Sequence, residues 1–139
     1  MTDPLQAALR VSASGLEVQS KRMRVVTENL ANAQSTSNTP GGDPYSRKVV
    51  TFESEVDEAA GANIVKVASI ERHRSPFRVE HNPGHPAADA NGFVKLPNVD
   101  IMTEVADMHE ANRSYEANLQ VIKQAREMIS MTIDLLRNN

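Results

Sequence analysis

The stretch IMTEVADMHEANRSYEANLQVIKQAREMISMTIDLLRNN (residues 101–139) repeats apolar residues in alternating steps of four and three. This spacing places them on one face of a long helix and is typical of a coiled-coil seam. Asn98 or Asp100 stands where a helix N-cap is expected. The residues predicted to pack across this seam are Ile101, Val105, Met108, Tyr115, Leu119, Ile122, Ile129, Ile133 and Leu136.

Residues 1–34 predict a second long helix with the same alternation of steps. Asp3 is a candidate N-cap, and Pro4 suits the first helical position. Ser12 and Gln19 interrupt the seam, and the small residues around Gly15 allow another backbone to approach closely. The residues predicted to pack along this seam are Leu5, Leu9, Leu16, Met23, Val26 and Leu30.

The segment between the helices is rich in β-branched and aromatic residues and in turn residues. It predicts short strands over residues 45–53, 64–70, 77–80 and 93–96, and a solvated linker over residues 53–63. Four aromatic side chains, Tyr45, Phe52, Phe77 and Phe93, are expected to form the compact core there. The predicted fold class is α+β, with a terminal helical assembly domain (residues 1–34 and 98–139) that forms a coiled-coil-like pair and a small β-rich insert (residues 35–97).

Composition excludes several functions. The chain has 139 residues, with 15 Lys+Arg against 18 Asp+Glu, so no overall positive field is available to bind nucleic acid. It has no cysteine, which excludes thiol catalysis and zinc–thiolate sites. No apolar run is long enough for a membrane helix, and no cleaved signal peptide is expected. No phosphate-binding glycine loop or nucleophile elbow is present, so we expect no enzyme activity, no cofactor and no small-molecule substrate.

Two side-chain clusters nevertheless suggest chemistry. His81, His85 and Asp89 are spaced by four residues, which on a helix would present a metal-binding face, as in a small metal-dependent enzyme. Prolines within this segment exclude a regular helix, so a turn with hydrogen-bonding histidines is the alternative interpretation. The basic residues Arg72, Arg74 and Arg78, with His73 between the first two, predict either an anion site or simple alternation along a strand.

Apolar residues also lie off the predicted C-terminal seam, so a hairpin of two helices would leave them uncovered. A large exposed apolar surface indicates binding partners. The chain is therefore predicted to be an assembly subunit whose terminal helices pack against copies of itself or related chains. The off-seam residues are Met102, Val121, Met128, Met131 and Leu135.

Three segments resemble the bacterial flagellar basal-body rod proteins, and within that group the proximal rod protein. Residues 13–16 (ASGL) and 28–33 (ENLANA) are similar to the N-terminal signature of axial proteins. Residues 82–94 (NPGHPAADANGFV) form the most specific match, followed by 96–99 (LPNV). Residues 112–118 (NRSYEAN) resemble the C-terminal helix signature.

This resemblance implies a structural, non-catalytic role in the rod that crosses the periplasm, with the terminal helices forming an inner tube. It implies partners as well: copies of the chain, other rod proteins, membrane-ring or adaptor proteins at the rod base, and the flagellar type III apparatus, which exports the chain without a cleaved signal. Another axial rod subunit is the nearest alternative, and a cytoplasmic coiled-coil adaptor and the metal-dependent enzyme are alternatives from other classes.

Overall fold

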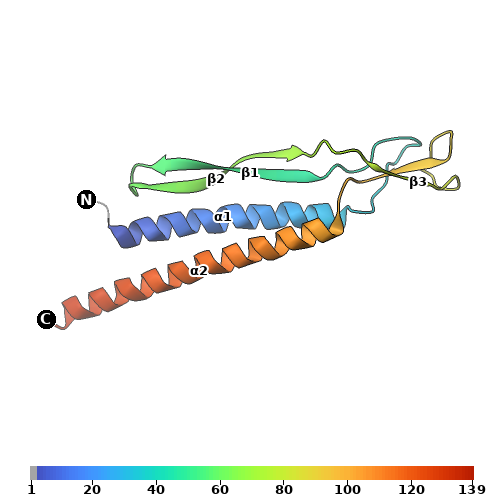
Figure 1. The fold of residues 1–139 in the computed structure, drawn as a ribbon. Coiled ribbons are helices and arrows are strands. Elements are labelled where there is room, and N and C mark those ends of the chain that lie inside the picture. The colour runs from blue at the N-terminus through green and yellow to red at the C-terminus, as the bar shows by residue number, and fades with distance from the viewer. Residues whose placement is uncertain (1–2) are drawn as a thin grey trace. The chain divides into compact units, whose positions relative to one another are not determined.

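The computed structural model describes residues 3–139 and contains two long helices with a β-rich insert between them in the chain (Figure 1). The helices are α1 (Pro4–Ala31) and α2 (Ile101–Arg137). The insert holds two two-stranded sheets, formed by β1 (Lys48–Asp57) with β2 (Ala62–Arg72) and by β3 (Arg78–His81) with β4 (Phe93–Leu96). The predicted α+β class is confirmed.

Both helices begin at caps that the sequence predicts. The Asp3 carboxylate accepts a hydrogen bond from the Leu5 N–H (3.0 Å), and the Asp100 carboxylate accepts one from the Met102 N–H (3.0 Å). These bonds satisfy N–H groups that have no partner within the first helical turn. α1 ends at Ala31, where the Asn32 side chain donates to the Glu28 carbonyl (2.9 Å). Within residues 3–139, neither helix is long and apolar enough to cross a membrane.

Contacts divide the chain into two compact units, and each helix contributes to both. The first unit comprises the chain up to Met23, Thr51–Ser69 and His109–Asn139. The second comprises Arg24–Val50 and Ile70–Met108. The domain boundaries expected near residues 34 and 98 stay a prediction.

In the first unit, the two helices run antiparallel and approach closely at Gly15. A Cβ atom on this glycine would lie 2.5 Å from the Asn118 side-chain nitrogen, so any larger residue here would force the Asn118 amide to move. About two helical turns along, an Arg22 guanidinium nitrogen lies 3.3 Å from a Glu110 carboxylate oxygen. These two contacts fix the antiparallel register of the helices within this unit.

The β1–β2 hairpin also packs against α1 in this unit. The Val65 N–H donates to the Ser14 hydroxyl (3.2 Å), and the Arg10 guanidinium donates to the Asp57 carboxylate (2.6 Å) at the hairpin turn. Burial acts to raise the pKa of Asp57, but the Ala60 N–H and the Arg10 guanidinium outweigh it and hold this pKa below its usual value. α1 is therefore covered by both α2 and the hairpin.

The solvated linker predicted over residues 53–63 is wrong for most of its length, because β1 continues to Asp57 and β2 begins at Ala62. Lys66 on β2 pairs with Glu53 (3.2 Å) and Glu55 (2.7 Å), which offsets the repulsion between these two carboxylates along the strand. The same two carboxylates raise the pKa of Lys66, Glu55 having the larger effect. The turn itself is short, and it ends at Gly61 with a positive φ of 62°.

The second unit contains the β3–β4 sheet and the long turn that connects its strands. β3 pairs antiparallel with β4, with Arg78 opposite Leu96 and His81 opposite Phe93. Near the end of the turn, the Asp89 carboxylate accepts hydrogen bonds from the N–H groups of Asn91 and Phe93 (2.9 Å each). The sequence predicts β4 with its observed bounds and β3 within one residue.

The prediction of an aromatic core in the insert is wrong. Phe52 and Phe93 are 38% and 42% exposed, and the buried apolar residues are small and come from the helices as well as the insert. A sheet of two strands cannot enclose a core of its own, so the interior consists of thin layers between helix and strand. These buried residues are Val18, Val25, Val26, Ala33, Ala60, Ala87, Val94, Val99, Ala111 and Ala125.

The close approach at Gly15 yields a coupling that can be measured. Gly15→Ala should gain about 1 kcal/mol of helix propensity, but in the wild-type background the added methyl meets the Asn118 amide and the gain is lost. In an Asn118→Ala background, the space is open. We therefore expect Gly15→Ala to be more favourable there by about 1 kcal/mol in the free energy of unfolding, measured by urea titration.

Ser20→Ala, at an exposed position of α1, is the matched control and should show no coupling to Asn118→Ala. Additivity of Gly15→Ala and Asn118→Ala within experimental error would show that the helices do not meet at this point.

Candidate functional site: an exposed helix face and a buried polar cluster

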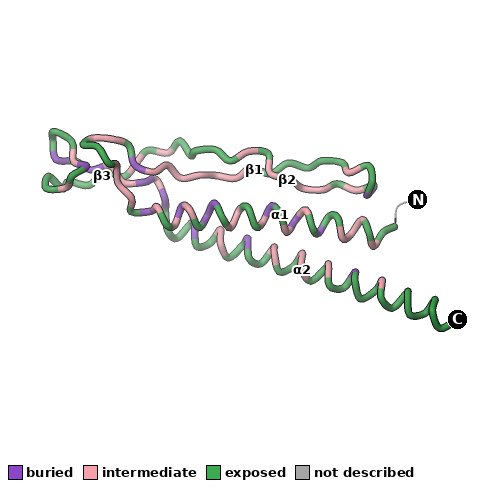
Figure 2. Tube along the Cα trace, turned by 180° about the vertical axis from the view of Figure 1, so that it is seen from behind, coloured by how far each residue is buried: buried purple, intermediate pink, exposed green. Residues whose placement is uncertain are grey.

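The candidate assembly surface is the side of α2 that the rest of the chain leaves uncovered. Figure 2 shows that exposure increases along α2 towards the C-terminus. Large apolar side chains stand in water there, and Met102, Leu135 and Leu136 are 77%, 69% and 74% exposed. The other exposed large apolar residues of α2 are Ile101, Val105, Val121, Met128, Met131 and Ile133.

The predicted seam residues differ in burial within the single chain. On α1, Val26 is buried, and Leu5, Leu9, Leu16, Met23 and Leu30 are half-buried. On α2, Met108, Tyr115, Leu119, Ile122 and Ile129 are half-buried, whereas Ile101, Val105, Ile133 and Leu136 are exposed. The structure therefore covers the middle of the α2 seam in part and leaves both of its ends free.

The buried residues of α2 do not coincide with the predicted seam residues. Glu104, Ala111 and Ala125 are buried, and Asn118 contacts Gly15. These positions are seven residues apart, so they form one stripe along the helix. Because small and polar residues occupy this inner stripe, the larger apolar residues beside it are free to contact other chains.

A buried polar cluster joins α1, β1 and α2 inside the second unit. The Asn29 side-chain amide donates to the Lys48 carbonyl (2.9 Å) and to the Glu104 carboxylate (3.1 Å). Its oxygen accepts from the Lys48 N–H (2.9 Å) and from the Tyr45 hydroxyl (2.7 Å). Asn29 thereby satisfies both main-chain groups of Lys48, as a neighbouring strand would.

The charge of Glu104 is compensated within the same cluster. Glu104 is fully buried, and its second oxygen accepts a charge-assisted hydrogen bond from the Arg47 guanidinium. Arg47 also lies 3.2 Å from Asp107, and its main-chain N–H donates to Asn98 (2.7 Å). Asn98 therefore holds the insert rather than capping α2. Removing one partner of such a buried ion pair typically costs about 3–5 kcal/mol.

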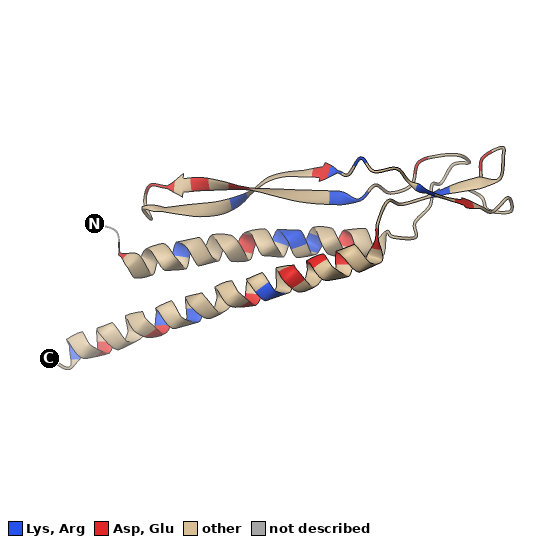
Figure 3. Cartoon of the chain, in the orientation of Figure 1, with Lys and Arg blue, Asp and Glu red and all other residues tan. Residues whose placement is uncertain are grey.

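The sequence analysis missed this cluster, although two features of the sequence point to its residues. Asn29 lies in the ENLANA motif, and Glu104 lies one residue before the predicted seam residue Val105. Figure 3 shows the corresponding charge pattern, with acidic residues in the first part of α2 and basic residues in the later part of α1. Polar residues that recur at heptad spacing on helices expected to pack together predict a polar contact between those helices.

The proposed metal site finds no support. His85 Nδ1 accepts a hydrogen bond from the Ala87 N–H (3.0 Å), and the Asp89 carboxylate binds turn N–H groups. The His81 ring packs edge-on against Phe93, with ring centroids 5.0 Å apart. In the described part of the chain, no group of three or more His, Cys, Asp or Glu side chains is arranged to hold a metal ion. The segment is a turn, as the alternative interpretation held.

The basic cluster is divided among different roles. Arg72 and Arg74 are exposed, and His73 Nδ1 lies 2.8 Å from the Ser75 hydroxyl. Arg78 donates to two main-chain carbonyls, those of Ala33 and Pro97, at 3.4 Å. The Arg78 guanidinium therefore makes only long, weak hydrogen bonds to the main chain.

The family described as "Flagellar basal body rod FlgEFG protein C-terminal" matches residues 90–135, which hold β4 and most of α2. The chain is 58% identical to the flagellar basal-body rod protein FlgC of Agrobacterium fabrum over 135 residues, which is 97% of each chain. It is 41% identical to that of Salmonella typhimurium (90% of this chain, 92% of the relative) and 34% identical to that of Bacillus subtilis (92% and 95%).

Two long terminal helices with an exposed apolar face, an insert between them and this family match define a structural protein of the flagellar rod. The chain belongs to the flagellar basal-body rod protein FlgC family. The resemblance seen in the sequence motifs is thus confirmed, and the cytoplasmic adaptor and metal-enzyme alternatives are set aside.

The polar cluster makes a testable prediction through Tyr45. Burial is the main cause that raises the pKa of Tyr45 to about 12, with the charges of Glu28 and Glu104 adding to it. Because this pKa is higher in the folded than in the unfolded chain, its contribution to stability is complete below pH 10 and is lost as the pH rises through about 12. In a Tyr115→Phe variant, absorbance at the tyrosinate wavelength should titrate with a midpoint near 12.

The same variant in denaturant provides the control, and its tyrosine should titrate near the ordinary tyrosine pKa of 10.0. Adding Glu104→Gln removes one nearby negative charge, so the folded midpoint should fall but stay above that of the unfolded chain. A folded midpoint equal to the unfolded one would mean that Tyr45 is not held in the cluster.

Proposed function

We propose that this chain is a subunit of the proximal rod that assembles through its terminal helices into the axial tube. The observation that carries the proposal is the uncovered apolar face of α2, because such a surface on a chain of this size requires a partner. The predicted seam residues form this packing surface together with their exposed neighbours. Torque then passes through many apolar contacts, each fully buried aliphatic side chain contributing about 1.5–3 kcal/mol.

The partners of this surface are copies of the chain and other flagellar rod proteins. Membership of the rod protein family supports this assignment. We further propose contacts with membrane-ring or adaptor proteins at the rod base, and export by the flagellar type III apparatus without a cleaved signal peptide. The chain then resides in the rod where it crosses the periplasm, and it has no catalytic activity.

Charge on the seam tests the assembly role. Leu119 is half-buried in the middle of α2, and the proposed tube buries it completely. Leu119→Asp would place an unpaired charge there, at a cost of several kcal/mol per subunit. We expect this variant to be exported but absent from isolated basal bodies, as measured by immunoblotting.

Glu58→Lys is the matched control, because Glu58 is exposed in the turn between β1 and β2. Glu55 is a poorer control than the sequence indicated, since it pairs with Lys66 in the sheet. Incorporation of Leu119→Asp at the level of Glu58→Lys would exclude the seam as a packing surface, and the tube arrangement with it.

The absence of catalysis is tested at the long turn. Main-chain hydrogen bonds hold this turn, including Asn82 to the Gly92 carbonyl (2.9 Å) and Ala88 to the His85 carbonyl (3.0 Å). The double variant His81→Ala/His85→Ala therefore keeps the turn and should swim at close to the wild-type rate in soft agar. Loss of motility in cells that still export and incorporate the variant would instead indicate a chemical role for these histidines.

A further inference from the structure

The last turns of α2 extend beyond the region that α1 covers. In the first unit Gly15 lies opposite Asn118, and α1 begins at Pro4, so its first residue lies opposite residues near Ile129. Ile129 is the last half-buried residue of the helix. Every residue from 130 to 139 is exposed, and we refer to residues 130–137 as the α2 overhang.

The overhang has one face of mixed character. Met131, Asp134 and Leu135 share a face, because residues three and four apart are neighbours on a helix. Met131 and Leu135 are 59% and 69% exposed. Asp134 pairs with Arg137 (3.2 Å), but both side chains are more than half exposed, so this pair contributes little. An uncovered helical segment this short is only marginally stable and gains from a partner.

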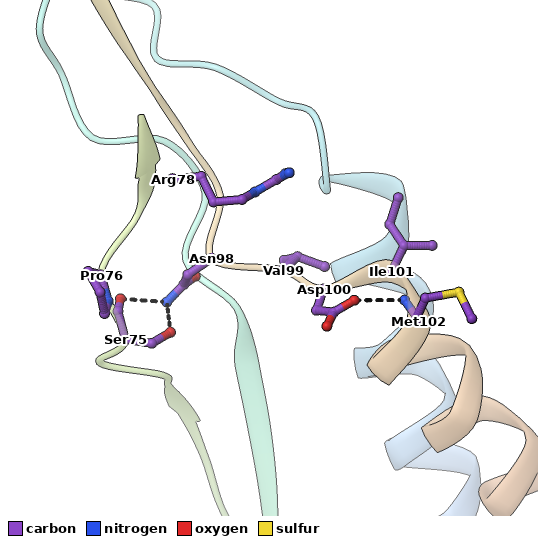
Figure 4. A pocket seen from close by; sticks show the side chains of 8 residues that line it. All are labelled: Ser75, Pro76, Arg78, Asn98, Val99, Asp100, Ile101 and Met102. Carbon is purple, nitrogen blue, oxygen red and sulfur yellow. Dashed lines mark hydrogen bonds between the residues drawn. The ribbon is translucent and has the colours of Figure 1, made fainter. Parts of the chain in front are cut away.

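A surface pocket of about 460 Å³ lies at the start of α2, within the second unit (Figure 4). The polar residues that line it already have hydrogen-bond partners: the Asn98 side chain donates to Ser75 (3.0 Å), and Asp100 caps the helix. The remaining lining is apolar apart from one cation, Arg78. The apolar lining residues are Pro76, Val99, Ile101 and Met102.

The pocket and the overhang are complementary in chemistry. The pocket presents apolar walls and the Arg78 guanidinium, which makes only 3.4 Å hydrogen bonds to main-chain carbonyls. The overhang presents apolar side chains around Asp134. The end of α2 also carries a partial negative charge and its start a partial positive charge, so an end-to-start contact is favourable.

We propose that the pocket at the start of α2 binds the α2 overhang of a second copy of this chain, with Leu135 entering the pocket and Asp134 pairing with Arg78. This inference rests on the proposed assembly function and names the surface and the partner. The two contact regions are different parts of the chain, so a single contact leaves one pocket and one overhang free, to which further copies can bind.

Cysteine cross-linking tests the contact directly, because the chain has no cysteine of its own. Full-length Met102→Cys and Leu135→Cys chains, distinguishable by mass, are mixed and oxidised mildly. A disulfide requires Cα atoms within about 7 Å, so a mixed dimer reports docking. We expect it to form at least tenfold faster than the dimer from the control mixture of Met102→Cys with Val121→Cys, an exposed position on the same helix.

Charge exchange tests the pairing. Arg78→Glu in the Met102→Cys chain should slow the cross-link about tenfold, and Asp134→Arg in the Leu135→Cys chain should restore it. This restoration also excludes misfolding of the Arg78→Glu chain as the cause. Slowing without restoration would overturn the Arg78–Asp134 pairing.

Equal rates in the test and control mixtures would overturn the docking itself. So would a disulfide in basal bodies between Met102→Cys and a cysteine placed in a different axial protein, because it would assign the pocket to that protein. In either case, the proposed assembly function would still be supported if the Leu119→Asp variant failed to enter basal bodies.

Discussion

The amide of Asn29 and the carboxylate of Glu104 lie against each other in the second unit, both shielded from water, and much of the local structure depends on their contact. Asn29 makes four hydrogen bonds, two of them to the main chain of Lys48, so the start of β1 is fixed at α1. Glu104 needs Arg47 to compensate its charge, which brings the same strand segment to α2. A buried carboxylate without these partners would be strongly unfavourable.

This polar contact also sets which residues of α2 face inward. With Glu104 buried, the residues seven and fourteen positions later, Ala111 and Asn118, turn to the same side. The larger residues Tyr115, Leu119 and Ile122 then lie beside the contact rather than at its centre. The chain thus satisfies the polar groups of this cluster internally and leaves apolar surface for association, as expected of a subunit whose folding and assembly are linked.

The elements could be predicted from sequence where local signals act alone. The two helices, their caps at Asp3 and Asp100, and β4 follow from periodicity and capping, which depend on neighbours in sequence. The errors arose where distant residues decide. Lys66 on the opposite strand allows Glu53 and Glu55 to lie in β1, and no feature within residues 53–63 reveals that partner.

The candidate site shows the same division. The exposed apolar residues of α2 followed from helical spacing, because surplus apolar residues on a helix are visible in the sequence itself. The displacement of the inner stripe by one residue could not be derived, since it depends on Asn29 reaching Glu104 across seventy-five positions of chain. The turn at the histidines could be predicted, because the prolines exclude the regular helix on which the spacing of His81, His85 and Asp89 would present a metal-binding face.

The glycine at the helix contact has a mechanical consequence. Glycine has no side chain that could change rotamer, so at Gly15 the main chain of α1 lies directly against the Asn118 side chain. A contact of long flexible side chains yields under load when those side chains adopt other rotamers. At Gly15 only the short Asn118 side chain can adjust, so twisting one helix against the other soon meets the main chain of α1 itself. A helix pair built in this way is torsionally stiff, which suits a component of a rotating shaft.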